Sequence, residues 1–321
     1  MNNVRFQELI ADELLLVEQR MREPDPDRHE AVHDAVMHLL SSGGKRVRPV
    51  VVLLACKLLA ADSERAINLA AAVEMLHTAT LVHDDIIDGS LVRRGNPTLN
   101  ASWSPGATIL TGDYLFARAA DLAAQTDSVP VMRLFAKALM TICNGELQQM
   151  FSSEKRQVDR DDYYRRIYAK TGSLFVLAAE ASGALAQVDS RARLDLRRYG
   201  KELGIAFQIV DDLLDFVGDE TRVGKPLGSD LAQGLITLPT ICYLEAFPDD
   251  RRVLDVLDGR RSPKHIRLAL EAVRGSEAVG RVMDEARHHA ALAQAAMVRL
   301  PDNGFRQSLL DLADYAVQRE L

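Results

Sequence analysis

Six aspartates form two groups with the same spacing, Asp-Asp-x-x-Asp. The first group is Asp84, Asp85 and Asp88, and the second is Asp211, Asp212 and Asp215. Residues four apart on an α-helix share a face, with about 5–6 Å between their Cβ atoms. The outer carboxylates of each group can therefore hold a hard divalent cation and leave positions open for phosphate oxygens. The predicted metal ligands are Asp84, Asp88, Asp211 and Asp215.

Each aspartate group follows a strongly apolar segment with helical spacing. The first segment reads AINLAAAVEMLHTATLV and the second reads ELGIAFQIV. A helix that is apolar on nearly all sides is normally buried. A single acidic group is often only a solvated helix end. Two such groups favour a metal site instead, because a helix C-terminus is already negative and unpaired buried carboxylates are costly.

Basic residues occur at two places in the sequence that could bind an anion. Residues 43–49 read GGKRVRP, a basic turn that opens a helix, where backbone N–H groups and the helix dipole suit an anion. Arg93 and Arg94 follow the first aspartate group directly. The simpler interpretations are a solvated basic turn and an ordinary salt bridge. The turn is not a nucleotide-binding P-loop, because the G-x-x-x-x-G-K-[ST] spacing is absent.

Helical segments separated by Gly and Pro make up the rest of the chain, and no convincing run alternates as a strand does. The segments that position the aspartates are 63–88 and 190–217. Other predicted helices include 106–125, 129–153, 161–187 and 229–246. We predict an all-α protein with a single domain over residues 1–321. It is expected to be a large helical bundle whose central cavity is lined by the two aspartate-rich helices.

The composition excludes several classes of function. Of 321 residues, 26% are charged, and the net charge is −7, whereas nucleic-acid binding requires a basic surface. Three scattered cysteines without C-x-x-C spacing predict neither a disulfide framework nor a zinc site. The first residues lack the pattern of a signal peptide, and the apolar runs are too short to span a bilayer. We expect a soluble, cytoplasmic protein.

Several motifs, in this order, resemble the trans-isoprenyl diphosphate synthase family, also called polyprenyl synthetases. They are GGKRVRP, HTATLVHDDIIDGSLVRRG, GDYLFARA, GELQQM, YAKTGSLF, and FQIVDDLLDF followed by VGKPLGSD, and they cover roughly residues 30–245. The resemblance implies the isoprenoid synthase fold and Mg²⁺-dependent, head-to-tail condensation of isopentenyl diphosphate with an allylic diphosphate such as farnesyl diphosphate. Released pyrophosphate would act as the base. A homodimer packing near residues 106–153 and, at most, transient membrane contact are also implied.

The same resemblance implies roles for individual residues. Isopentenyl diphosphate would be held by Lys45, Arg48, His77 and Arg94. The allylic diphosphate would be held by Arg93, Lys170, Lys225 and Mg²⁺ ions, usually three, bridged by Asp84, Asp88 and Asp211. Thr171 and Gln208 would lie beside the substrate or the metal shell, which Asp85, Asp212 and Asp215 would complete.

Some of these residues have simpler alternatives. His77 could be a hydrogen-bonded core histidine, Lys170 and Thr171 a helix-end cation and cap, and Gln208 a structural amide. One position departs from the family: Leu235 stands where many relatives have a lysine. A phosphate contact from that position is therefore in doubt.

Product length depends on the helix that precedes Asp84. One helical turn of roughly 5.4 Å matches one extended isoprene unit, so this helix can act as a ruler. Ala79 and Thr80, one turn before Asp84, are small where short-chain relatives place a bulky aromatic residue, so the chain should reach towards Leu76 and Val73. We expect a medium- or long-chain product of about six to ten isoprene units, with octaprenyl as the single best expectation.

Two alternatives remain open, and the basic turn argues against two further ones. A residue on another helix could block the growing chain earlier, which would make the protein a short-chain, geranylgeranyl-type synthase. The chain could also be the non-catalytic subunit of a two-component synthase, although such subunits typically lose the aspartates. A class I terpene cyclase or a head-to-head condensing enzyme would not need the GGKRVRP turn with His77 and Arg94.

Overall fold

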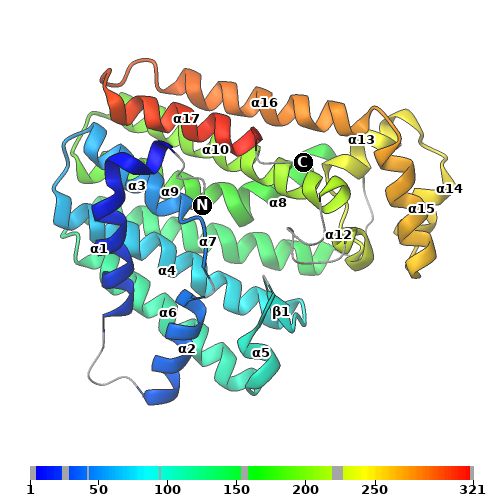
Figure 1. The fold of residues 1–321 in the computed structure, drawn as a ribbon, viewed down its shortest axis with the longest axis horizontal. Coiled ribbons are helices and arrows are strands. Elements are labelled where there is room, and N and C mark those ends of the chain that lie inside the picture. The colour runs from blue at the N-terminus through cyan, green and yellow to red at the C-terminus, as the bar shows by residue number, and fades with distance from the viewer. Residues whose placement is uncertain are drawn as a thin grey trace. The chain divides into compact units, whose positions relative to one another are not determined.

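The computed structural model describes residues 5–23, 29–41, 43–93, 95–152, 158–218 and 227–318, and helices dominate it (Figure 1). The all-α class is therefore confirmed. The chain forms two compact units. The first comprises Met1–Leu139, Leu174–Gly200 and Ala296–Asp311, and the second Met140–Ser173, Lys201–Ala295 and Leu312–Leu321. The single domain stays a prediction, and each unit is described by itself below.

The elements follow one another along the chain in this order: η1 (Arg5–Ile10), α1 (Ala11–Arg22), α2 (Glu30–Ser41), α3 (Val47–Leu58), α4 (Ser63–Ile87), β1 (Val92–Arg93), β2 (Asn96–Pro97), α5 (Leu99–Ser102), α6 (Pro105–Ala124), α7 (Val129–Ser152), α8 (Arg160–Ile167), η2 (Tyr168–Gly172), α9 (Ser173–Leu185), α10 (Ser190–Val217), α12 (Ser229–Gln233), α13 (Leu238–Ala246), α14 (Arg251–Leu257), α15 (Pro263–Arg274), α16 (Ala278–Ala296) and α17 (Gly304–Gln318). Within the described ranges, every helix is too short or too polar to be a membrane span.

Helix α4 is the buried centre of the first unit. Asp62 caps its start by accepting a hydrogen bond from the Arg65 backbone N–H. Its apolar residues are buried on all sides, as the sequence predicted, because α1, α3 and α6 pack around it (Figure 1). Each buried CH₂ group stabilises the folded state by roughly 0.8 kcal/mol, so this packing holds the helix in place. The last turn of α4, which carries the first aspartate group, is thereby held by a rigid element.

Gly112 lets α6 approach α4 closely. A Cβ atom at this position would lie only 2.5 Å from Cε1 of His83. The His83 ring in turn stacks on Phe116, with 5.1 Å between ring centroids. Because His83 immediately precedes Asp84, this close approach also holds the end of α4 that carries the aspartates.

Helix α10 contributes the corresponding apolar segment in the second unit. Ile209, Val210, Leu213 and Phe216 are each 0% exposed and belong to one core with residues of α8 and α13–α16. At 100° per residue they lie on one face of α10, about 120° wide, which packs into this core. The second aspartate group is interleaved with them, so it too lies on a packed helix.

Two predicted helices differ from the structure, and one element was not predicted. The helix predicted over 161–187 contains the π-helical turn η2, and π turns are frequent at functional sites. The helix predicted over 229–246 is broken at Gly234, whose φ of 82° is left-handed. A two-residue ribbon, β1 with β2, follows the first aspartates, where Gly95 adopts a φ of 79°. Local backbone geometry, rather than apolar periodicity, decides all three.

Candidate active site

The first aspartate group ends α4. Asp84 is half-buried, Asp85 is 5% exposed and Asp88 is exposed. Asp85 accepts hydrogen bonds from Arg93, at 3.0 Å from Nε and 2.8 Å from Nη2. Burial raises the pKa of the Asp85 carboxyl, while the Arg93 guanidinium opposes that shift. Arg93 therefore holds the Asp85 carboxylate in place, whereas Asp84 and Asp88 lie nearer to solvent.

The second aspartate group lies in the last two turns of α10. Asp211 is half-buried, while Asp212 and Asp215 are 6% and 1% exposed. Asp212 accepts hydrogen bonds from the Tyr163 hydroxyl at 2.8 Å and the Gln208 amide at 2.7 Å. Burial, and then the nearby carboxylate of Asp230, raise the pKa of Asp212. The middle aspartate of each group is therefore turned inward onto protein donors.

Asp215 holds the turn that precedes α12. Its carboxylate accepts hydrogen bonds from the Ser229 hydroxyl at 2.7 Å and the Asp230 backbone N–H at 3.0 Å. Its backbone carbonyl accepts another from the N–H of Gly228, whose φ of 73° is left-handed. The sequence analysis did not foresee this role. Asp84, Asp88 and Asp211 are the members of the two groups that are half-buried or exposed.

The residues present fit a magnesium site of a particular kind. Among the described residues, no three His, Cys, Asp or Glu side chains converge into a preformed metal cage. Mg²⁺ dehydrates reluctantly and is usually held by one or two carboxylates, with waters and substrate phosphates completing its octahedron. Pairs of carboxylates at the end of α4 and on α10 suit a magnesium ion that is held by few protein ligands. The two groups belong to different compact units, and their shared cavity stays a prediction.

In the basic turn, Arg46 has a structural role that the sequence did not distinguish. Arg46, with a φ of 48°, forms ion pairs with Glu18 and with Glu74 at 3.0 Å and donates to the Leu40 carbonyl at 3.1 Å. Lys45 is exposed, and the Arg48 guanidinium lies 5.0 Å from the Phe175 ring centroid. The two residues predicted to bind substrate are thus distinct from the one that holds the turn.

We expect Arg46→Met to lower the free energy of unfolding by about 3 kcal/mol, because it leaves the buried Glu74 carboxylate without its cation. Arg46 and Glu74 side chains are 15% and 6% exposed. Adding Glu74→Met should restore most of the loss, since an apolar pair often replaces a buried ion pair without cost. Chemical denaturation measures both. Arg22→Met is the control: Arg22 shares the Glu18 and Leu40 partners but is 33% exposed, so its loss should stay below about 1 kcal/mol.

The π-helical turn η2 presents two predicted site residues. Lys170 is exposed, with its Nζ 3.4 Å from Glu146, and the Thr171 hydroxyl donates to Gln208 Oε1 at 2.5 Å. Gln208 is therefore joined to both Thr171 and Asp212. Leu235 donates its backbone N–H to the Asp230 carbonyl at 2.8 Å, which is a role any residue can perform. In the second unit, the structure brings Thr171, Gln208 and Asp212 together.

The remaining predictions concern α4 and two residues outside the described ranges. Leu76 and Ala79 are 0% exposed, and Thr80 is 9% exposed, with its hydroxyl donating to the His77 carbonyl at 2.7 Å. His77 itself is half-buried. Arg94 and Lys225 lie outside the described residues. The roles given to all these residues stay predictions.

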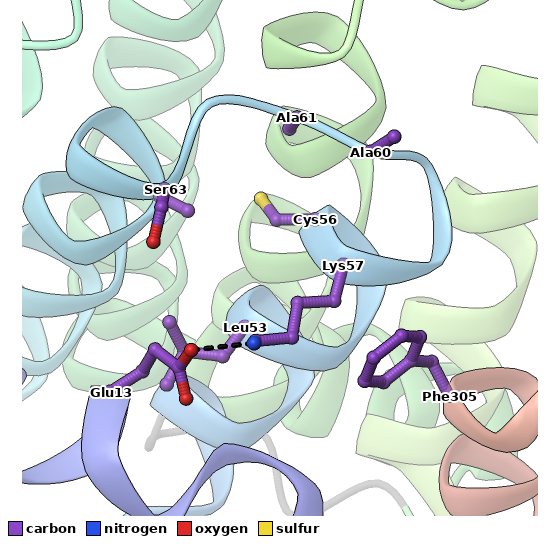
Figure 2. A pocket seen from close by; sticks show the side chains of 9 residues that line it. Glu13, Leu53, Cys56, Lys57, Ala60, Ala61, Ser63 and Phe305 are labelled. Carbon is purple, nitrogen blue, oxygen red and sulfur yellow. Dashed lines mark ion pairs between the residues drawn. The ribbon is translucent and has the colours of Figure 1, made fainter.

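A small pocket elsewhere in the first unit is not the predicted site. It has a volume of about 310 Å³, and its lining contains none of the predicted site residues (Figure 2). Lys57 pairs with Glu13 at 2.5 Å across it, so these two charges cancel. Burial raises the pKa of the Cys56 thiol to about 12, which keeps that group neutral and unreactive. Nothing in the lining favours a phosphate ligand.

Comparison with known proteins gives a consistent picture. The family model described as polyprenyl synthetase matches residues 29–273. Octaprenyl diphosphate synthase of Escherichia coli is 33% identical, with 100% of both chains covered. Heptaprenyl diphosphate synthase component 2 of Geobacillus stearothermophilus is 36% identical over 97% of both chains. The crystal structure of a Caulobacter crescentus polyprenyl synthase, complexed with calcium and isoprenyl diphosphate, matches with a TM-score of 0.89 at 37% identity, covering 99% of this chain and 98% of the other.

Proposed function

This chain belongs to the polyprenyl synthetase family and is a prenyltransferase, and from this premise we propose its specific reaction. It joins isopentenyl diphosphate head-to-tail to an allylic diphosphate, repeatedly, and releases pyrophosphate at each step. The product is an all-trans polyprenyl diphosphate of about six to ten isoprene units, with octaprenyl as the specific expectation. The reaction takes place in the cytoplasm, with membrane contact only when the apolar product leaves.

One observation supports this reaction above all. Each of two buried, rigid helices ends in the same aspartate pattern, with the middle carboxylate fixed by Arg93 or Tyr163 and the first left half-buried. This arrangement leaves Asp84 and Asp211 at the helix surface, where a cation that carries phosphates can reach their carboxylates. A structural helix terminus has no need for such order, because a negative charge there works against the helix dipole.

The chain's residues divide the chemistry between two substrates. When bound, Mg²⁺ supplies Lewis-acid neutralisation of charge on the leaving diphosphate. Lys170 and Lys225, with Arg93, stabilise the same oxygens as the allylic C–O bond breaks and its electrons leave with the diphosphate. The double bond of isopentenyl diphosphate then forms the new C–C bond, and a proton leaves to the released pyrophosphate. Lys45, Arg48, His77 and Arg94 hold the second diphosphate in place.

The test is elongation by the purified protein alone. Labelled isopentenyl diphosphate, farnesyl diphosphate and Mg²⁺ are incubated with the protein, and the products are separated by chromatography and weighed by mass spectrometry. We expect labelled polyprenyl diphosphates, centred on octaprenyl, and no elongation when EDTA removes the metal. If the protein elongates nothing by itself, the alternative of a non-catalytic subunit of a two-component synthase is favoured. The Geobacillus stearothermophilus relative is named as component 2 of its synthase.

We also propose that the chain forms a homodimer through α6 and α7. Large apolar side chains on these helices are exposed: Leu110 by 69%, Met140 by 59% and Phe151 by 81%. Exposed apolar residues at this density often mark a protein interface. Light scattering after gel filtration should give twice the mass of one chain. Leu110→Lys and Phe151→Lys should each shift the mass towards one chain, and Val298→Lys, which changes a 72%-exposed residue outside α6 and α7, should not.

A further inference from the structure

Three hydrogen bonds connect α8, η2 and α10 into one chain of side chains. The Tyr163 hydroxyl donates to Asp212 Oδ2 at 2.8 Å, and Gln208 Nε2 donates to Asp212 Oδ1 at 2.7 Å. The Thr171 hydroxyl donates to Gln208 Oε1 at 2.5 Å. Both oxygens of Asp212 therefore accept from protein donors. The two partners of the Gln208 amide also fix which way that amide points.

This chain of hydrogen bonds lies directly beside two groups that the proposed reaction uses. Lys170 precedes Thr171 on the π-helical turn, and Asp211 precedes Asp212 on α10. π turns are rare and occur mostly as single turns inside α-helices, frequently at functional sites. The bond from Thr171 to Gln208 joins this turn to α10, and Asp212 holds Gln208 in turn.

Tyr163 lies at the far end of the chain of hydrogen bonds and is 1% exposed. Its ring is enclosed by Tyr164, at 5.5 Å between centroids, and by the Arg166 guanidinium at 5.8 Å. In this buried position the hydroxyl donates to Asp212. Tyr163 cannot act on substrate from this buried place. Its effect must pass through Asp212 and Gln208.

We propose that Tyr163 is a positioning residue that sets the geometry of Lys170 relative to Asp211 through Asp212, Gln208 and Thr171. This inference rests on the proposed function, because it assigns the fixed geometry to binding of a diphosphate with its metal. Residues that orient metal ligands typically contribute 10- to 100-fold to metal affinity or activity. Removing one hydroxyl should therefore have an effect well beyond its contribution to stability.

The experiment compares Tyr163→Phe with Tyr199→Phe. Tyr199 is a matched control: it is 0% exposed and its hydroxyl also donates at 2.8 Å, but to the backbone carbonyl of Leu309. Calorimetry measures binding of inorganic pyrophosphate in the presence of Mg²⁺, and steady-state kinetics give kcat and the KM for farnesyl diphosphate. Thermal unfolding is followed for both variants.

We expect Tyr163→Phe to weaken binding of magnesium pyrophosphate about tenfold and to lower kcat/KM by a similar factor. Tyr199→Phe should leave both within twofold of wild type, although both variants lose a buried hydrogen bond and unfold at lower temperature. Equal binding and kinetics in the two variants would overturn the proposal and leave Tyr163 a purely structural residue. So would wild-type protein that binds no magnesium pyrophosphate.

A second variant keeps the test decisive if Tyr163→Phe does not fold. Thr171→Val cuts the same chain of hydrogen bonds at its other end and should give the same tenfold loss, with Thr171→Ser restoring binding. The proposed function and this inference fail differently. Binding of magnesium pyrophosphate without any elongation by wild type contradicts the reaction but still reports on Tyr163.

Discussion

Asp84→Asn should lower kcat/KM on the order of 10²–10³-fold while leaving the protein as stable as wild type or slightly more stable. The activity falls because the neutral amide holds a divalent cation far more weakly than a carboxylate does, and electrostatic preorganisation is the largest catalytic contribution expected here. The stability holds because Asp84 and Asp88 repel one another four residues apart at the negative end of α4. Removing that repulsion and the unfavourable interaction with the helix dipole should add about 0.3–1 kcal/mol to the free energy of unfolding.

Kinetics at several Mg²⁺ concentrations and chemical denaturation measure the two effects together. Asp62→Asn is the matched control, because it makes the same change on the same helix at the opposite end. Asp62 caps α4 through the Arg65 N–H, and asparagine caps as well as aspartate. Activity and stability should therefore stay near wild type. Asp84→Asn with unchanged kcat/KM would show that the end of α4 is an ordinary helix terminus.

Asp85→Asn should behave differently from Asp84→Asn. Asp85 is 5% exposed and paired with Arg93, whose side chain is 37% exposed, so its neutralisation weakens this ion pair rather than relieving repulsion. The structure thus predicts that Asp84 supports function at a cost to stability, whereas Asp85 supports both function and stability. This distinction does not follow from the spacing of the motif.

Thr80→Phe should shorten the main product from about eight isoprene units to four or fewer. Thr80 lies four residues before Asp84, on the same face of α4, so a phenyl ring there would block an isoprenoid chain growing along the helix. Thr80 is 9% exposed, whereas Ala79 is 0% exposed. Ala79→Phe is expected to shorten the product too, but it also overpacks the core, at roughly 1–3 kcal/mol. Thr80 is therefore the cleaner position for the test.

The product lengths of a series of variants at Thr80 and Leu76 test directly whether α4 sets the chain length. Thr80→Val, Thr80→Leu and Thr80→Phe should shorten the product progressively. Leu76→Phe, one turn further from Asp84, should give a product about one isoprene unit longer than that of Thr80→Phe, because one turn spans roughly 5.4 Å. Thr78→Phe is the control, since Thr78 faces away from Thr80 on α4. A product spectrum that stays unchanged in Thr80→Phe, or shortens equally in Thr78→Phe, would contradict the ruler.

The positions of the helices could be predicted closely, and those of the breaks within them could not. The segments 63–88 and 190–217 agree with α4 and α10 within a few residues, because apolar spacing over many turns is a strong local signal. The π turn at Tyr168–Gly172 and the break at Gly234 are set by single residues and tertiary contacts. Periodicity contains no information about either.

The sequence by itself determined the chemistry: two aspartate patterns at the ends of apolar helices, a basic turn, and membership of a family. Those features depend on covalent spacing and helical geometry, which neighbouring residues specify. Only the tertiary structure decided which aspartates of each group turn inward and that Arg46 holds the basic turn. Tyr163 and Asp212 are 49 residues apart in the chain, and Arg46 and Glu74 are 28 apart. Partners so distant meet only through packing of whole helices, so their hydrogen bonds are a property of the fold.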